Sequence, residues 1–368
     1  MTPAALNRHP ALATRFCTLV GVRYPIVQTG MGWVSGPRLT AATANAGGLG
    51  ILAAATMNRA QLDAAITDVK GRTTAPFGVN LRADAPDAAE TVDLIVRHGV
   101  RLASFAGAPR QDLIRRLKDA GVLTMPTVGA RRHAEKMQQW GVDAVIAQGH
   151  EGGGHTGPIP TTLLLPEVCR GVDIPVLGAG GFHCGRGLVA ALAYGAAGIA
   201  MGTRFLLTKE SRVPEGVKQQ YLATDARGTV VSTAVDGHPQ RVIRTGFIDA
   251  LERSGSLAAL GRALRHASAF RDLTGVGVLD LLREARAMRK NQELTWAQLA
   301  MAANAPMLTR ASMVDGRADT GILPTGQVVG VIDELPSVAE LLERIMNEAD
   351  ETLQRLTGAT PPSGTTYV

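Results

Sequence analysis

The sequence predicts an α/β fold, a (β/α)₈ TIM barrel with a mainly helical cap inserted after the eighth strand. Short apolar runs rich in β-branched residues recur through the first 205 residues, and helix-like stretches lie between them. Strands that alternate with helices at this spacing are typical of parallel βαβ units. The chain has 368 residues, enough for a barrel, which usually takes about 250, and an insertion.

Eight such runs follow one another at intervals of about 21 to 31 residues. They start near Tyr24, Gly48, Ala75, Val100, Gly121, Asp143, Ile174 and Gly198. The helix-like stretches between them are Pro37–Asn45, Arg59–Lys70, Ala88–His98, Gln111–Asp119, Arg131–Gln139 and Arg186–Tyr194. Eight is the strand count of a closed (β/α)₈ barrel. A doubly wound open sheet is the competing interpretation of the same alternation.

The alternation of strands and helices stops after Arg204, and this change predicts three regions. Residues 1–205 form the barrel, residues 206–318 form a basic helical cap that binds substrate, and residues 319–368 return to the barrel. In the cap no strand repeat is evident, and we expect helices at Phe247–Glu252, Ala258–Phe270, Val278–Lys290 and Trp296–Ala303. Ser337–Leu356 has the i, i+3, i+4 apolar pattern of a closing amphipathic helix.

The composition excludes several classes of protein. With 45% apolar residues the chain can bury a core, so extensive disorder is excluded. No apolar run is long enough for a transmembrane helix, and the first twenty residues lack the apolar core of a secretory signal. Cys17, Cys169 and Cys184 are widely spaced, which fits reduced thiols and not a disulfide framework or zinc site. We expect a cytoplasmic protein with no membrane partner and no metal.

The net charge of +6 lies mainly in the predicted cap. Residues 206–318 contain 16 Lys and Arg against 11 Asp and Glu, and the rest of the chain is nearly balanced. Thirteen of the 16 are arginines, among them Arg241, Arg244, Arg262, Arg265, Arg283, Arg286 and Arg289. Arginine binds phosphate and carboxylate through paired hydrogen bonds, so the cap is a candidate surface for an anionic substrate such as a nucleotide or coenzyme A. A solvated helix face is the simpler interpretation. Nucleic acid is not expected, because no aromatic platform or nucleic-acid motif accompanies the arginines.

Two glycine-containing segments resemble a phosphate cradle. Gly178, Gly180 and Gly181 follow predicted strand 7 and precede a helix, and Gly202 and Thr203 follow strand 8. Glycine lets a ligand approach the backbone, and N–H groups at a helix start attract anions. The loops after strands 7 and 8 are the usual phosphate site of this barrel, so the pair predicts a phosphorylated cofactor. The alternative is that these glycines only form tight turns.

The segment Gly152–Gly157 is the most unusual of the chain. Gly153 and Gly154 precede His155, and three glycines in a row serve no purpose in a packed core. They would let a flat ligand approach the backbone with an imidazole beside it, and imidazole exchanges protons near neutral pH. His155 is therefore the candidate catalytic residue, with a structural hydrogen bond as the alternative. Catalytic roles for His150 and His183, and a supporting role for Glu151, are less favoured.

Polar side chains and glycines at other strand ends suit a planar ring. Gly30 and Met31 follow strand 1, where exposed backbone could lie against a ring. Asn80 and Gln148 end strands 3 and 6, and their amides can both donate to and accept from a heterocycle. Structural roles remain the alternative for each. A planar, phosphorylated cofactor without a metal suggests flavin mononucleotide (FMN).

Seven segments, in order along essentially the whole chain, resemble the nitronate monooxygenase superfamily, formerly 2-nitropropane dioxygenases, which also holds flavin enoyl-thioester reductases. They are PIVQTGMG at 25–32, NAGGLGIL at 45–52, PFGVN at 76–80, AQGHEGGGHTG at 147–157, LGAGGFHCGRG at 177–187, AMGTRF at 200–205 and TGQVVG at 325–330. The resemblance implies a TIM barrel with non-covalent FMN. It also implies flavin contacts at Met31, Asn80, Gln148, Gly180, Gly181, Gly202, Thr203 and Gln327, and an active-site histidine at His155.

The sequence departs from the common family pattern in places that bear on substrate. The segments at 30–36, 151–166 and 294–308 look like a branch that acts on the CoA thioester of a hydroxy-indane carboxylate from steroid rings C and D. The best-known nitronate oxidisers have active-site tyrosines in their C-terminal half, but here none lies between Tyr221 and Tyr367. Cys184 also replaces an aspartate usual in the family, which removes an expected helix cap.

Three hypotheses follow. The first is an FMN-dependent oxidoreductase acting on a CoA thioester, with NAD(H) as redox partner and His155 exchanging a proton with the substrate or polarising its carbonyl. The second is a nitronate monooxygenase that uses oxygen, or a flavin enoyl-thioester reductase. The third is a flavin-free phosphate-binding barrel. A homodimer is expected only because such barrels commonly form dimers.

Overall fold

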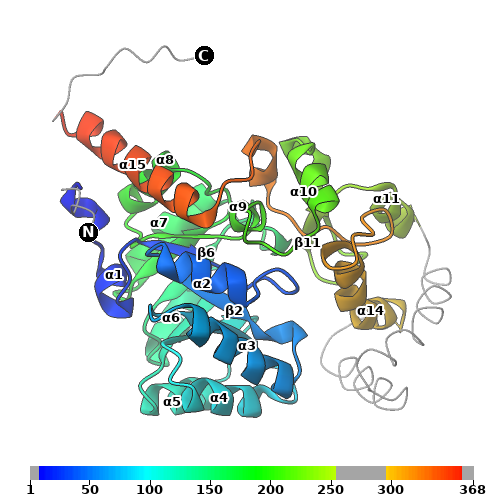
Figure 1. Ribbon diagram of the computed structural model, residues 1–368, viewed down its shortest axis with the longest axis horizontal. Coiled ribbons are helices and arrows are strands. Elements are labelled where there is room, and N and C mark those ends of the chain that lie inside the picture. The colour runs from blue at the N-terminus through cyan, green and yellow to red at the C-terminus, as the bar shows by residue number, and fades with distance from the viewer. Residues whose placement is uncertain (1–7, 254–295, 359–368) are drawn as a thin grey trace. The chain divides into compact units, whose positions relative to one another are not determined.

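The computed structural model describes residues 8–253 and 296–358 (Figure 1). It divides the chain into two compact units. The barrel unit consists of Met1–Glu151, Pro158–Arg212 and Glu334–Val368, and the second unit consists of Gly152–Gly157 and Val213–Asp333. No helix of the described residues is long and apolar enough to cross a membrane.

The barrel unit contains the closed eight-stranded parallel barrel that the spacing predicts. The strands follow one another around the barrel in chain order, and β1 pairs with β9 to close it. They are β1 (Ile26–Gln28), β2 (Leu49–Ala53), β3 (Gly78–Arg82), β4 (Leu102–Ala106), β5 (Leu123–Val128), β6 (Val145–Gln148), β8 (Val176–Ala179) and β9 (Ile199–Met201). Each corresponds to one predicted run, so the barrel is confirmed and the open sheet is wrong.

The core fills the inside of the barrel with branched apolar side chains. Val27, Leu49, Ile51 and Leu177 are fully buried in one cluster. Phe16, from α1, joins the same cluster. At roughly 25 cal/mol per Å² of apolar surface removed from water, this continuous burial is the main stabilising contribution to the barrel.

The predicted helices of the barrel unit are present, and the structure adds three more. The predicted ones are α2 (Pro37–Asn45), α3 (Arg59–Arg72), α4 (Ala88–Arg97), α5 (Gln111–Asp119), α6 (Arg131–Gln139), α8 (Gly185–Ala193) and α15 (Val338–Leu356). The three additions are α1 (Arg15–Val20), α7 (Thr161–Gly171) and the short α9 (Thr203–Leu206), and the 3₁₀ turns η1 (Pro10–Leu12) and η2 (Ala54–Thr56) complete the unit. Ser337 begins α15 with a capping box, because its side chain accepts from the N–H of Glu340 while Glu340 accepts in return.

Helix α15 runs against α8, and the two meet closely at one glycine (Figure 1). A Cβ at Gly185 would overlap backbone atoms of Ile345 and Ala349. Only glycine lets the first turn of α8 approach α15 this closely, so this glycine serves helix packing.

The second unit contains a small sheet that the sequence did not predict. Its strands are β10 (Thr229–Ser232), β11 (Gln240–Ile243) and β7 (Gly154–His155), all antiparallel, in the order β10-β11-β7. Its helical elements are α10 (Glu215–Leu222), α11 (Gly246–Arg253), α14 (Trp296–Met313), η3 (Ala226–Gly228) and η4 (Gln327–Val331). The sequence analysis found no strand repeat here, because four-residue strands leave little periodic signal and β7 comes from far upstream.

The bounds of the second unit also differ from the predicted cap. The unit extends over Val213–Asp333 and not 206–318, and it takes in Gly152–Gly157. The helices predicted at 258–270 and 278–290 lie outside the described residues. The helix predicted at 296–303 is the start of α14, which continues to Met313.

The three cysteines are free and partly buried, which allows a test of the packing around them. Burial raises the pKa of the Cys169 thiol to about 11, and it also raises the pKa values of Cys17 and Cys184. All three thiols are therefore protonated at neutral pH and poorly nucleophilic. We expect slow alkylation of native protein at pH 7 and rapid reaction of three thiols after unfolding. Rapid stoichiometric labelling of native protein would contradict this burial.

Candidate active site

The predicted flavin residues of the barrel unit gather at one rim. Because all eight strands are parallel, their carboxyl ends lie at the same end of the barrel. The residues at or near these ends are Gly30 and Met31 after β1, Asn80 in β3, Gln148 at the end of β6, Gly178 in β8, Gly180 and Gly181 after β8, and Gly202 and Thr203 after β9. The predicted end of strand 3 at Asn80 is wrong, because β3 continues to Arg82. The rim is therefore the candidate cofactor site.

Gly30 and Asn80 approach each other so closely that no side chain fits at position 30. A Cβ there would overlap the Asn80 Cβ and would lie 2.9 Å from its Cγ. Asn80 is 9% exposed, and its Nδ2 donates to Ser104 Oγ at 2.9 Å. The hydrogen bond orients the Asn80 amide at the rim, and Gly30 is the residue that makes room for it.

The loop after β1 is held from inside by a buried glutamine. Gln28 donates through Nε2 to Ser35 Oγ at 2.8 Å, and Ser35 Oγ accepts the Met31 N–H at 2.9 Å. Gln28 is fully buried, and its Oε1 has no hydrogen-bond partner among the described residues. A buried amide oxygen without a partner is costly, which is a feature of sites that receive a ligand.

The same loop stores backbone strain at Trp33. Its φ is +64°, the one positive φ of a non-glycine residue in the described part of the chain. The Arg212 Nε donates to the Trp33 carbonyl at 2.7 Å and holds this conformation. Strain of this kind costs roughly 1–3 kcal/mol and clusters at functional sites.

The loop after β8 exposes backbone as a phosphate site requires. Gly180 and Gly181 have φ of +96° and +84°, a conformation that glycine adopts most easily. A Cβ at Gly181 would meet nothing nearer than 3.8 Å, so the space beside it is open. The Thr161 Oγ1 lies 3.1 Å from the Gly180 carbonyl and 2.8 Å from a Glu151 carboxylate oxygen, which joins this loop to the one after β6.

The loop after β9 lies beside the loop after β1. A Cβ at Gly202 would lie 3.5 Å from the Met31 Sδ, and the Thr29 N–H donates to the Met201 carbonyl at 3.2 Å. Thr203 begins the short helix α9 and is 8% exposed. Glycine backbone after β8 and β9, with oriented amides across the rim, fits a planar cofactor that carries a phosphate.

The start of α8 does not have the role that the sequence predicts for it. The Gly185 N–H donates to the Glu348 carboxylate at 2.6 Å, and Arg186 forms an ion pair with the same carboxylate at 2.8 Å. Cys184, at the N-cap, makes no capping hydrogen bond. Glu348 of α15 thus occupies the anion position that we expected a phosphate to use, and the cradle is reduced to the glycines after β8 and β9.

His155 lies on β7 in the second unit, where it contacts a carboxylate. Its Nε2 is 2.6 Å from Asp236 Oδ2, and its ring meets the His238 ring edge-on with 5.9 Å between centroids. β7 is fixed by pairing with β11, in which His155 stands opposite Gln240. The His155 side chain is 61% exposed, so the imidazole is supported on one side and accessible on the other.

Asp236 is buried and held as an anion. It accepts the His238 N–H at 3.1 Å through Oδ1. Burial acts to raise the pKa of Asp236, but the hydrogen bond and charge of His155, with the His238 N–H, outweigh it and lower the pKa below its ordinary value. A carboxylate only accepts hydrogen bonds, so the imidazole carries its proton on Nε2.

In the second unit, the predicted residue Gly153 packs against the two residues that precede Gln327. A Cβ at Gly153 would overlap the Thr325 carbonyl carbon and would lie 2.6 Å from the Gly326 nitrogen. Gln327 follows directly and begins η4. Gly154, with φ of +67°, then leads into His155. The predicted residues therefore form two groups, one at the barrel rim and one around β7.

Comparison with known proteins decides the family. A sequence model described as nitronate monooxygenase matches residues 13–95 and 89–348. This chain belongs to the nitronate monooxygenase family. Members of this family are flavin enzymes, and the protein is an oxidoreductase of the nitronate monooxygenase-like superfamily.

Within the nitronate monooxygenase family, the chain is similar to proteins with different named activities. It is 56% identical over 345 residues to (3aS,4S,5R,7aS)-5-hydroxy-7a-methyl-1-oxo-octahydro-1H-indene-4-carboxyl-CoA dehydrogenase of Rhodococcus jostii, covering 94% of this chain and 98% of that protein. It is 33% identical to a probable nitronate monooxygenase of Staphylococcus saprophyticus, covering 64% and 80%. The structure of FabK from Thermotoga maritima superposes with a TM-score of 0.77 at 34% identity, covering 94% and 99%.

Two of the seven arginines named as candidates for anion binding lie in the described part of this nitronate monooxygenase family member, and both contact other residues of the chain. Arg241 is 3% exposed and donates to Thr229 Oγ1 at 3.1 Å, and Arg244 pairs with Asp249 at 3.2 Å. The other five named candidates lie at 254–295, outside the described residues. Arg241 is thus a buried structural residue, and recognition of an anion by the remaining arginines stays a prediction.

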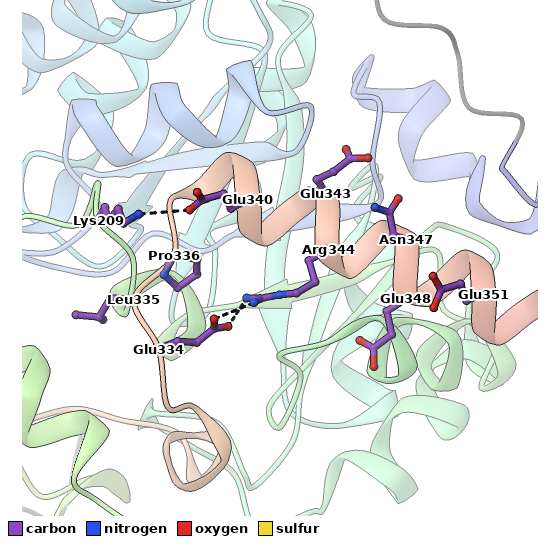
Figure 2. A pocket seen from close by; sticks show the side chains of 10 residues that line it. All are labelled: Lys209, Glu334, Leu335, Pro336, Glu340, Glu343, Arg344, Asn347, Glu348 and Glu351. Atoms are coloured by element: carbon purple, nitrogen blue, oxygen red, sulfur yellow. Dashed lines mark hydrogen bonds and ion pairs between the residues drawn. The ribbon is translucent and has the colours of Figure 1, made fainter. Parts of the chain in front are cut away.

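A pocket of about 720 Å³ lies along α15 and is not the predicted site (Figure 2). Its lining includes Glu340, Glu343, Glu348 and Glu351, and Lys209 pairs with Glu340 at 3.5 Å. Carboxylates repel a phosphate or a CoA, so this surface does not suit the phosphorylated cofactor or the anionic substrate that the sequence predicts.

Asp236 is the functional candidate that sequence reasoning missed. It is separated from His155 by 81 residues, so no local motif joins them. The signal that could have found it is Asp236-Gly237-His238 between two β-branched runs, because Asp-Gly between such runs is typical of a hairpin turn. Of the less favoured candidates, Glu151 caps α7 through the Thr161 N–H at 2.9 Å, and His183 has a buried Nδ1 without a partner among the described residues.

Proposed function

We propose that this protein is an FMN-dependent oxidoreductase that acts on the CoA thioester of a hydroxy-indane carboxylate, as in steroid ring C and D breakdown, with NAD(H) as the redox partner. The observation that carries the proposal is 56% identity along 94% of the chain to a dehydrogenase named for that substrate. Identity at this level over nearly the full length of both proteins supports a shared substrate class.

The barrel rim supports FMN as the flavin. Gly180, Gly181, Gly202 and Thr203 would bind the phosphate through backbone N–H groups, and Asn80 would bind the ring edge. Met31 and Gln148 would also contact the flavin, as would Gly178 and Gly30 through exposed backbone. Gly153, Gly154 and Gln327, of the second unit, are proposed contacts as well. Bound FMN supplies hydride transfer, which protein side chains cannot provide.

His155 is the proposed proton-exchanging residue. With its Nε2 proton directed at Asp236, the imidazole has its lone pair on Nδ1, which suits it to take a proton from a substrate. When the ring becomes charged, the adjacent carboxylate stabilises it.

Oxidation of alkyl nitronates is the second candidate, supported by the 33% identity to a probable nitronate monooxygenase. One observation weighs against it. Tyr221, the only tyrosine of the second unit, is fully buried, and its Oη donates to the Pro324 carbonyl at 2.9 Å. Because its side chain is buried in the core, Tyr221 cannot serve as an active-site tyrosine of the kind that the best-known nitronate oxidisers have.

Cofactor extraction and product analysis test the proposal. Purified protein should release about one FMN per chain, and with NAD⁺ it should oxidise the hydroxy-indane carboxyl-CoA thioester. The free acid is the matched control, because it has the same rings without CoA. Protein that binds no flavin, or that oxidises a nitronate but not the thioester, would contradict the proposal.

A further inference from the structure

The pair of His155 and Asp236 has the geometry of a carboxylate–imidazole dyad in which the acid is fixed and the base is presented. The side chains are 61% and 11% exposed, with 2.6 Å between Nε2 and Oδ2. The acid is thus the buried member. A second such pair, His98 with Asp63, has the same 2.6 Å distance but the opposite burial, at 16% and 49%. There the carboxylate lies on the surface, as in an ordinary ion pair.

The turn between β10 and β11 holds the Asp236 carboxylate in place. Gly237, with φ of +87°, donates its N–H to the Thr233 carbonyl at 2.9 Å, and the His238 N–H donates to Asp236 Oδ1 at 3.1 Å. One carboxylate oxygen therefore belongs to the turn and the other to His155. The pairing of β7 with β11 fixes the backbone of His155 against the same hairpin, so both members of the dyad are on one rigid support.

Among the described residues, Asp236 and His238 contact the imidazole, and both come from the turn before β11. On β11 itself, Arg241 stands opposite Gly154, and its guanidinium donates to Thr229. Asp236 is the anion among these three residues.

We propose that Asp236 is the positioning residue of His155: it holds the ring orientation and the Nε2–H tautomer, and it stabilises the imidazolium that forms when Nδ1 takes a proton. This rests on the proposed function of His155. Asp236 touches neither substrate nor cofactor in this role. A misoriented ring or the wrong tautomer lowers the rate without changing the chemistry of the residue itself.

Substitution of Asp236 tests the proposal through the rate and through its recovery by a second carboxylate. Asp236→Asn should lower kcat/KM for the thioester by about 100-fold, with flavin content unchanged. Asp236→Glu, which keeps the carboxylate, should recover part of the loss. A double variant with His155→Ala should be no slower than His155→Ala alone, since Asp236 acts through the ring.

Asp63→Asn is the matched control, because it removes an identical carboxylate–imidazole contact from the helices of the barrel unit. It should leave the rate unchanged. An Asp236→Asn variant with the wild-type rate, in a protein that His155→Ala impairs, would overturn the proposal. So would additive losses in the double variant.

A tautomer measurement separates failure of this proposal from failure of the proposed function. Long-range ¹H–¹⁵N NMR of the flavin-loaded protein, with the His155 signal assigned by its loss in His155→Ala, needs no substrate. We expect the Nε2–H tautomer in the wild type and a mixture in Asp236→Asn. If the thioester is not a substrate but the tautomer changes, the proposed function fails and the dyad stands. An unchanged tautomer in Asp236→Asn overturns the dyad whatever the substrate is.

Discussion

Replacing His155 with alanine should lower the rate of substrate oxidation by about 10³-fold, within the usual range for loss of a general acid–base group, while the protein keeps its flavin. The fold should survive, because the ring is 61% exposed and β7 is held by backbone pairing with β11. Truncation of an exposed side chain leaves no cavity to destabilise the core.

Single-turnover reduction of the bound flavin measures this effect directly. His98→Ala is the control, because it also removes an imidazole that contacts a carboxylate at 2.6 Å, but from the helices of the barrel unit. His98→Ala should reduce its flavin at the wild-type rate. If His155→Ala retains both flavin and the wild-type rate, the residue has a structural role only.

Replacing Gly30 with alanine should weaken FMN binding by about 10- to 100-fold. The added Cβ would overlap the Asn80 Cβ, which is fixed to β3 and cannot move aside as a flexible side-chain end could. Overpacking of this kind costs roughly 1–3 kcal/mol, and each 1.4 kcal/mol corresponds to about a tenfold change in affinity. The displacement of Asn80 would also disturb its hydrogen bond to Ser104.

Gly36→Ala is the matched control for this variant. It lies in the same loop, but its Cβ would meet nothing nearer than 3.8 Å and its φ of −87° suits any residue. Flavin fluorescence quenching should give a wild-type dissociation constant for Gly36→Ala and a raised one for Gly30→Ala. Full flavin occupancy of Gly30→Ala at low FMN would remove Asn80 and Gly30 from the proposed site.

The barrel could be predicted because its sequence pattern is local. Each strand is buried on both faces and therefore appears in the sequence as a short apolar run, and the βα units have similar lengths. α7 was missed because Pro166 interrupts its interior, where proline normally breaks a helix. Its start is stabilised by Glu151, ten residues earlier, so the helix depends on a contact that no propensity describes.

The rest of the site depends on contacts between distant residues. The sequence showed that Cys184 leaves α8 without a cap, but not that Glu348, 163 residues away from Gly185, replaces it. It singled out His155 by its glycines, but Asp236 becomes visible only when β7 joins the hairpin of β10 and β11. The glycines and histidines of the site can be recognised from the local sequence. The carboxylates that contact them lie far away in the sequence and cannot.

The visible spectrum of the purified protein during an anaerobic titration distinguishes the three hypotheses. We expect an FMN spectrum that bleaches when the hydroxy-indane carboxyl-CoA thioester is added and recovers when NAD⁺ follows. Bleaching by propionate 3-nitronate, but by neither the thioester nor NADH, would contradict it and favour nitronate oxidation. A colourless protein that takes up no FMN would contradict both.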